Sequence, residues 1–318
     1  MPILLLTEAE VRDLLTMEMA LEAVETGLRQ MALHEAENIS RSRCQTDQAV
    51  LHVMSAAANS LRVMGYKAYA TSRKGANFHV GLFDGQTGEM TALVQADYLG
   101  QMRTGAASGI ATKYLARAEA SNAGLFGVGK QARTQLLAIC KVRTIKHICV
   151  FSRNEENRRK FCTEMTPLCQ CPVEPASRPE EAAMGKDIVI TATTSREPVL
   201  MGAWLAQGSH LNIIGSNYLS KTEIDVAAIH RANTIVVDSK DQAHLEAGDF
   251  RQARDEGALQ WSSVSELGEV IAGRTPGRQR PSDITLFKSV GLAIEDVATA
   301  TKIVALAQEL NVGRWIEW

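Results

Sequence analysis

The sequence predicts an α/β protein built from two parts: a doubly wound domain with a parallel sheet, and an α+β domain. The first observation is length, because 318 residues at roughly 150 residues per domain correspond to two domains. The second is a change of pattern near residue 118. Mixed helical and hairpin-like segments precede it, and short apolar strands alternate regularly with helical segments after it.

The part before residue 118 begins with helices and continues with strands. Thr7 and Glu10 form a capping-box pattern that predicts a short helix, and apolar periodicity predicts a longer helix over residues 17–34. Asp97 is a good N-cap for a helix that runs to about residue 116 and is rich in small side chains. Alternating patterns predict strands at residues 49–54, 63–70, 79–83 and 90–95, the last two flanking a turn at 84–88.

The part after residue 118 predicts a parallel sheet, because strands alternate with helical segments. Strands are expected at residues 124–127, 147–151, 187–192, 210–215, 234–238 and 284–287. A turn at Gly291 then precedes a helix over about residues 294–310, which could pack on either part. The expected domains are therefore 1–117 and 118–291, with residues 292–318 following.

Composition excludes several classes of protein. Lys and Arg number 34 against 36 Asp and Glu, so a net charge of −2 offers no basic field for a nucleic acid. No apolar run approaches the roughly 20 residues of a membrane span, and no signal-peptide pattern opens the chain. The six cysteines do not have zinc-site spacing, so we expect Cys162, Cys169 and Cys171 to be free thiols. We expect a cytoplasmic protein without a metal.

One glycine-rich turn predicts a dinucleotide site. The residues that match G-x-G-x-x-A, directly after an apolar strand and before a helix, are Gly127, Val128, Gly129, Lys130, Gln131 and Ala132. The first glycine allows a tight turn, and the second lets a pyrophosphate approach the backbone at the N-terminus of the helix. The strand–turn–helix context makes this motif far more specific than the glycines alone.

The end of the next strand indicates which dinucleotide is bound. NAD selectivity calls for an acid there, but the sequence has Phe151 followed by Ser152, Arg153 and Asn154. These side chains can donate hydrogen bonds to a 2′-phosphate, with Arg158 and Arg159 one turn further on. The sequence therefore favours NADP(H), with NAD(H) as the alternative.

Further ligand contacts are expected where the later strands end, because ligands bind outside the carboxyl ends of parallel strands. Thr191 and Thr193 follow one strand, and Ser216 and Asn217 follow the next. Together with the glycine turn, these small polar residues predict a crevice of Rossmann type.

Several short motifs in the right order resemble the ornithine cyclodeaminase and mu-crystallin family over nearly the whole chain. They are MRTGAAS at 102–108, the turn at 127–132, the segment 215–225 with Lys221, Thr222 and Glu223, ELGEV at 266–270, and TLFKSVG at 285–291 followed by Glu295 and Asp296. The resemblance implies a central Rossmann domain. It also implies a first domain, completed by the C-terminal helix, that binds substrate and forms a homodimer.

The resemblance also implies roles for single residues. It places the family's substrate-carboxylate clamp on Arg41 and Arg103 and its active-site lysine on Lys67, with Arg43 as the alternative to Arg41. Thr104 and Ser289 match positions that contact the cofactor. A carboxylate calls for a planar guanidinium, and a lysine can bind that carboxylate or supply a proton.

Two departures from the family pattern narrow the expected activity. Cyclodeaminases carry an acid where this chain has His52 and another where it has Asn217, and an amide cannot transfer a proton near pH 7. With Asn217 at this catalytic position, the remaining parts suit a simpler reaction: NADPH-dependent reduction of the C=N bond of a pyrroline- or piperideine-2-carboxylate to an L-amino acid. Arg41 and Arg103 would hold the imine carbon about 3 to 3.5 Å from the hydride donor.

Other functions stay open at this point. An amino-acid dehydrogenase of the alanine dehydrogenase kind would use the same clamp on a 2-oxo acid and ammonia. An ornithine cyclodeaminase is a weaker enzymatic alternative. An NADPH-binding protein of the crystallin kind, without turnover, is the alternative outside enzymes.

Overall fold

The computed structural model describes residues 2–317, and the chain forms two compact units. Unit 1 comprises residues 1–106 and 291–318, and unit 2 comprises residues 107–290. The division falls within the helix α3 (Asp97–Leu115), and the boundary expected near residue 118 stays a prediction.

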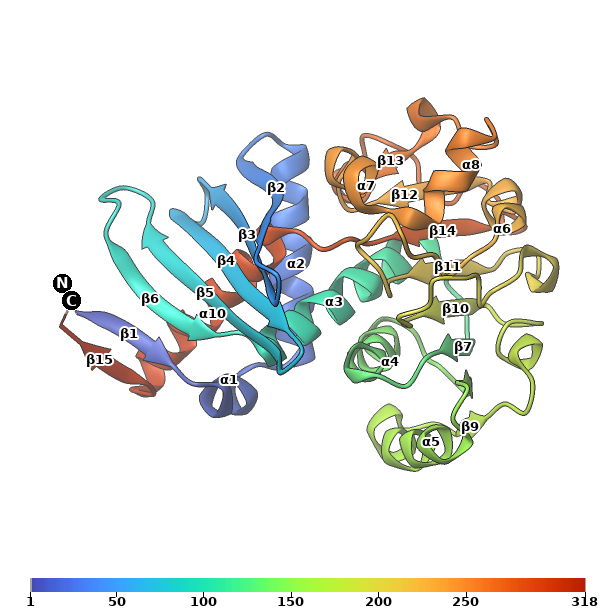
Figure 1. The fold of residues 1–318 in the computed structure, drawn as a ribbon, viewed down its shortest axis with the longest axis horizontal. Helices are drawn as coiled ribbons and strands as arrows, with labels where there is room; N and C mark the ends of the chain where they lie inside the picture. The colour runs from blue at the N-terminus through green and yellow to red at the C-terminus, as the bar shows by residue number, and fades with distance from the viewer. Residues whose placement is uncertain (1, 318) are drawn as a thin grey trace. The chain divides into compact units, whose positions relative to one another are not determined.

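Unit 1 is a seven-stranded sheet with helices packed on it (Figure 1). The strand order is β15-β1-β6-β5-β4-β3-β2, antiparallel except where β1 pairs with β6. Its helices are α1 (Glu8–Leu14), α2 (Met17–Ala32) and α10 (Ala293–Leu310). Its strands are β1 (Ile3–Leu6), β2 (Ala36–Gln45), β3 (Ala49–Ala58), β4 (Val63–Ser72), β5 (Gly75–Asp84), β6 (Met90–Gln95) and β15 (Arg314–Ile316).

Alternation along the strands decides which face of this sheet is covered. In β3, His52, Met54, Ala56 and Ala58 are buried, whereas the residues between them are exposed or half-buried. Helix α10 packs on the buried face, across β2 to β5, and against α2. The predicted hairpin and the capping box of α1 are confirmed, whereas β1 and β15 were not expected. Both strands are too short to show a pattern of their own.

The start of α3 has a partner that is remote in sequence. Asp97 is the first residue of the helix and lies in its first turn, one position later than a cap. The carboxylate of Glu8 accepts from the amides of Asp97 at 3.1 Å and Tyr98 at 2.7 Å. A carboxylate at a helix N-terminus satisfies amides that lack partners within the helix.

Unit 2 has the predicted doubly wound form, with an eight-stranded parallel sheet in the order β13-β12-β14-β11-β10-β7-β8-β9. Strand order reverses between β7 and β10, where ligands bind in such sheets. The strands are β7 (Asn122–Phe126), β8 (His147–Phe151), β9 (Val173–Pro175), β10 (Ile188–Thr191), β11 (His210–Ile213), β12 (Thr234–Val237), β13 (Ser265–Glu266) and β14 (Thr285–Lys288). The longer helices are α4 (Lys130–Val142) and α5 (Glu155–Cys169), and the shorter ones are α6 (Val226–Arg231), α7 (Lys240–Glu246), α8 (Arg251–Asp255) and α9 (Leu267–Ile271).

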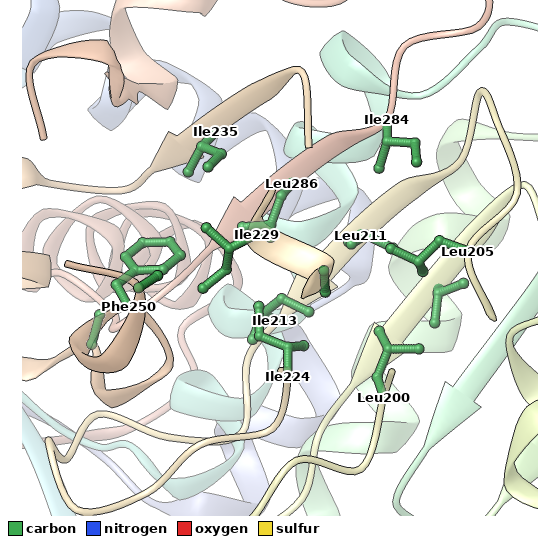
Figure 2. Packing of buried hydrophobic residues seen from close by; sticks show 14 of the residues in the cluster. Leu200, Leu205, Leu211, Ile213, Ile224, Ile229, Ile235, Phe250, Ile284 and Leu286 are labelled. Carbon is green, nitrogen blue, oxygen red and sulfur yellow. The ribbon is translucent and has the colours of Figure 1, made fainter. Parts of the chain in front are cut away.

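The central strands of unit 2 are buried on both faces, as expected for a parallel sheet. Figure 2 shows one of the two apolar clusters, in which Leu211, Ile213 and Leu286 from the strands pack with Ile229 and Phe250. In the other cluster, Cys162, Cys169 and Cys171 are buried free thiols. Within residues 2–317 no helix is long and apolar enough to cross a bilayer.

Candidate functional site

Three buried cations gather on the covered face of the unit 1 sheet. Arg41 lies in β2, Lys67 in β4 and Arg103 in α3, and their exposed fractions are 9%, 3% and 6%. A bulge between Ile39 and Ser42 in β2 shifts its register against β3. Arg41 is thereby turned inward and buried, and its charge acts on Lys67.

Two acidic residues at the start of α10 hold this cluster together. Asp296 Oδ1 accepts from Lys67 Nζ at 2.8 Å and from Arg103 Nε at 3.1 Å. Glu295 Oε2 accepts from Arg103 Nη1 at 2.7 Å. Both carboxylates are fully buried in the first helical turn, where the helix dipole favours negative charge.

These neighbours shift the pKa values of the two central cations in opposite directions. Burial by itself lowers the pKa of Arg103, but Asp296 and Glu295 outweigh it and hold that pKa above its usual value. Burial, followed by the charge of Arg103, lowers the pKa of Lys67 from 10.5 to about 8, although Asp296 opposes the shift. Lys67 therefore carries its proton at pH 7 and can release it readily.

The turn at Gly291 fixes both arginines. Its carbonyl accepts from Arg41 Nη2 at 3.1 Å. A Cβ at this position would lie 2.6 Å from Arg103 Nη1, and the backbone has a φ of +80°, so only glycine leaves room for the guanidinium without strain.

Arg43, the alternative clamp residue, has a different partner. It is exposed, and its Nε donates to His52 Nδ1 at 3.2 Å. Burial, then the charges of Arg43 and Arg41, lower the pKa of His52 to about 4, so the ring is neutral at pH 7. Because Nδ1 accepts from Arg43, the proton of His52 lies on Nε2, which is 3.2 Å from Thr71 Oγ1. His52 is thus tied into the sheet and is a poor proton donor.

The cations of the cluster suit an anion. Three cations are buried close together, Arg41, Lys67 and Arg103, and the ion pairs of Lys67 and Arg103 go to Glu295 and Asp296. Guanidinium groups can bind a substrate carboxylate through two oxygens.

The glycine turn of unit 2 fits a dinucleotide pyrophosphate. Gly127 has a φ of +103°, and a Cβ there would lie 2.5 Å from the Ala192 carbonyl, so a larger residue would collide with the loop after β10. Gly129 is the N-cap of α4, makes no side-chain cap, and has open space at its Cα. Val128 is half-buried and Lys130 is exposed. The backbone amides at this helix end can therefore meet a phosphate.

The tip of β8 carries one arginine with an exposed guanidinium. Arg153 is exposed, and no group within residues 2–317 bonds to its guanidinium. Arg158 folds back onto the carbonyl of Ser152 and the Phe151 ring, and Arg159 pairs with Glu155 at 2.7 Å. The side-chain oxygen of Asn154 caps α5.

The remaining candidates lie at strand ends or in α3. Thr193 and the fully buried Thr191 both donate to Glu223, and contact of either residue with a cofactor stays a prediction. Ser289 donates to Asp238 at 2.9 Å, at the ends of β14 and β12. Thr104 donates to the Gly100 carbonyl one turn earlier in α3.

The other three candidates differ in exposure. Ser216 is buried beside the half-buried Asn217, and Gln131 is half-buried in the first turn of α4. The same part of the chain, residues 2–317, holds no group of three His, Cys, Asp or Glu side chains that could bind a metal ion.

The sequence pattern assigns no role to the acidic partners of these cations. In the sequence, Glu295 and Asp296 stand out only as part of a family motif. Two adjacent acids in the first turn of an otherwise apolar helix could have indicated a buried partner for the cations. Glu223, Asp249 and Lys288 in unit 2 were missed likewise, and their burial shows only in the fold.

Comparison with known proteins shows the family of the chain. The model of the ornithine cyclodeaminase/mu-crystallin family matches residues 2–310. A Δ1-pyrroline-2-carboxylate reductase of Bacillus cereus is 34% identical over 99% of this chain and 100% of its own length. The structure of the Thermococcus litoralis Δ1-pyrroline-2-carboxylate reductase with NADH and L-proline is 34% identical, with a TM-score of 0.94 and coverage of 98% and 99%. An archaeal alanine dehydrogenase dimer with bound NAD is also 34% identical, with a TM-score of 0.94 and full coverage of both chains. The chain belongs to the ornithine cyclodeaminase/mu-crystallin family.

Proposed function

We propose that this protein is an NAD(P)H-dependent reductase that converts a small cyclic ketimine acid of the pyrroline- or piperideine-2-carboxylate type into the L-amino acid. The buried cluster of two guanidinium groups and a lysine, from Arg41, Arg103 and Lys67, carries the proposal because such groups can bind the carboxylate of a ketimine acid and supply a proton beside it. The glycine turn at residues 127–132 supplies the backbone cradle for the dinucleotide. The named activities of relatives in the family support the same reaction.

The residues of unit 1 bind the substrate and supply the proton. Arg41 and Arg103 hold the carboxylate, and Asp296 and Glu295 keep Arg103 in place. The turn at residues 127–132 would hold the dinucleotide, whose reduced nicotinamide would supply the hydride for the imine carbon. Lys67, with a pKa of about 8, donates a proton to the imine nitrogen as the C=N bond becomes CH–NH. Donation also removes the positive charge that would otherwise repel an iminium.

A substrate panel tests this function. The purified protein is mixed with NADPH or NADH and each of pyrroline-2-carboxylate, piperideine-2-carboxylate and pyruvate, with and without ammonia, and nicotinamide absorbance is followed. We expect rapid oxidation with the cyclic ketimine acids and no dependence on ammonia. No oxidation with any of these acids would contradict an enzyme and favour a nucleotide-binding protein.

An amino-acid dehydrogenase is the second candidate, because an alanine dehydrogenase dimer resembles the chain as closely as the pyrroline-2-carboxylate reductase does. It would oxidise the reduced cofactor with pyruvate at a rate that rises with ammonia concentration. A cyclodeaminase would form proline from ornithine with catalytic NAD, but His52 is neutral and Asn217 is an amide, so neither supplies the acid that such a reaction needs.

For the cofactor, we propose a preference for NADPH, supported by the exposed Arg153 and the lack of an acid at the tip of β8.

Arg153→Ala is expected to raise the KM for NADPH roughly tenfold, because one charge-assisted hydrogen bond is lost, and to leave the KM for NADH unchanged. Initial rates with each cofactor measure this. Arg159→Ala is the matched control, because Arg159 pairs with Glu155 in the same helix. Equal losses with both cofactors would contradict the assignment.

We also propose that the protein is a homodimer joined through the uncovered face of the unit 1 sheet. Ile39, Leu51, Val53 and Met64 are exposed on that face, which is unusual for large apolar side chains gathered on neighbouring strands. A relative of similar length forms a dimer.

Light scattering should give twice the chain mass of 34.6 kDa for the wild type and a monomer for Met64→Asp. Leu245→Asp, at an exposed leucine of α7, should stay dimeric. A monomeric wild type would refute the proposal.

A further inference from the structure

Three charged side chains are buried at the carboxyl edge of the unit 2 sheet, and the proposed reaction uses none of them. Glu223 and Lys288 have no exposed surface, and Asp249 is only 3% exposed. Lys288 ends β14, and Glu223 lies in the segment that follows β11. Burying three charges is costly, and an apolar cluster would hold the same strands together at least as well. Their presence therefore calls for a role other than stability.

Glu223 joins the ends of two neighbouring strands. Its Oε1 accepts from the amide of Thr193 at 2.6 Å and from the Thr193 hydroxyl at 2.8 Å. Its Oε2 accepts from the Thr191 hydroxyl at 2.8 Å and from the amide of Gly215 at 2.6 Å. A Cβ at Gly215 would collide with Oε1 and with the Thr193 carbonyl, so a glycine is needed for this approach. Four donors on one carboxylate fix the loops after β10 and β11.

Lys288 and Asp249 complete the arrangement. Lys288 Nζ lies 2.8 Å from Asp249 Oδ2 and donates to the Ser216 carbonyl at 2.7 Å. Asp249 Oδ1 accepts from the amide of Glu223 at 2.6 Å. Burial and the charge of Asp249 raise the pKa of Glu223, and Lys288 opposes this shift. The three side chains together carry one net negative charge when all are ionised.

We propose that Glu223, Asp249 and Lys288 form a buried brace that positions Thr193 and Ser216 for the cofactor. The loops that the brace holds adjoin the glycine turn, since a Cβ at Gly127 would lie 3.2 Å from Thr193 Cγ2. The inference rests on the proposal that this edge binds the dinucleotide. The three residues act through the loops, so they are positioning residues.

Glu223→Gln tests the brace directly. Each carboxylate oxygen of Glu223 accepts from one backbone amide, that of Thr193 or that of Gly215. A glutamine has an NH2 group in place of one of these oxygens, and this group cannot accept from an amide. One of the two loops therefore loses its hydrogen bond. We expect the Kd for NADPH, measured by fluorescence titration, to rise at least tenfold while circular dichroism shows a folded protein. Thr191→Val removes one donor and no charge, and should raise the Kd about threefold even if Glu223→Gln fails to fold.

The charge of the brace is tested by a pair of variants. Lys288→Met leaves two buried carboxylates, and we expect a Kd for NADPH that rises tenfold at pH 8 and recovers towards pH 6 as one carboxylate takes up a proton. The double variant Lys288→Met with Asp249→Asn restores one net negative charge. It should bind NADPH more tightly than Lys288→Met at pH 8 and lose the pH dependence. If Lys288 and Asp249 only stabilised the fold, the losses of NADPH affinity from the two substitutions would add in the double variant.

The matched control is an ion pair at the opposite end of β10. Asp187 pairs with Arg117 and accepts from the amides of Ser121 and Asn122. Asp187→Asn should lower the melting temperature and leave the Kd for NADPH unchanged. If folded Glu223→Gln bound NADPH with the wild-type Kd, or if the double variant bound it as weakly as Lys288→Met, the brace would be refuted but not the proposed cofactor site. Gly129→Asp places a carboxylate where the pyrophosphate would bind. An unchanged Kd for NADPH in that variant would refute the proposed cofactor site, and the brace with it.

Discussion

Arg103→Ala is expected to lower kcat/KM for the ketimine acid by about a thousandfold and to leave the Kd for NADPH unchanged. The substitution removes a guanidinium from the carboxylate clamp and leaves the buried carboxylates of Glu295 and Asp296 without it. Truncating one partner of a buried, hydrogen-bonded charge pair weakens binding by about 2 to 5 kcal/mol, and about 4 kcal/mol of lost transition-state binding corresponds to a thousandfold in kcat/KM. Initial rates and a fluorescence titration with NADPH measure the two quantities.

Two further variants separate the clamp from general loss of charge. Arg103→Lys keeps a positive charge but loses the planar fork, so we expect activity between that of Arg103→Ala and the wild type. Arg43→Ala should keep full activity, because Arg43 bonds to His52 outside the cluster. Circular dichroism checks that each variant is folded. Turnover that persists in folded Arg103→Ala would show that the clamp is assigned to the wrong residue.

The second large effect is expected from Lys67. Its pKa is lowered from 10.5 to about 8, so the free enzyme holds this proton below pH 8 and loses it above. Since kcat/KM reports the ionisation of the free enzyme, it should be level below pH 8 and fall about tenfold per pH unit above it. A pH profile with pyrroline-2-carboxylate measures this.

Lys67→Met should lower kcat by roughly 10²- to 10⁴-fold, the usual contribution of a positioned proton donor, and abolish the fall above pH 8. A lysine that only bound the substrate carboxylate would raise KM and leave kcat nearly unchanged. Lys113→Met, at an exposed lysine of α3, is the control and should behave as the wild type. If the fall above pH 8 survives in Lys67→Met, another group titrates there.

The parts of the fold that could be predicted depend on residues close together in the sequence. They are the capping box of α1, the hairpin of β5 and β6, and the alternation of strands with helices in unit 2. Gly127 was predicted from its neighbours alone, and its φ of +103° follows from the tight turn between β7 and α4. Asp97 was predicted to begin its helix, and α3 begins there. The contact of Glu8 with the Asp97 amide could not be predicted, because Glu8 is 89 residues away.

The site was only partly accessible to sequence reasoning. Family motifs indicated Arg41, Lys67 and Arg103, and the structure brings these three together. The separation of Arg41 from Arg43 depends on a bulge in β2 that no pattern in the sequence announced. Asp296 meets Arg103 across 193 residues of chain, so its part in the cluster could not be read from spacing.

The sequence by itself determined the two architectures, the dinucleotide turn and two of the three cations, Lys67 and Arg103, because periodicity, turns and motifs are local properties of a chain. Tertiary structure alone decided which carboxylates neutralise those cations, what pKa Lys67 adopts and how Glu223 joins two loops. The physical reason is that burial and ion pairing depend on distances in space, and the fold sets these between residues remote in sequence.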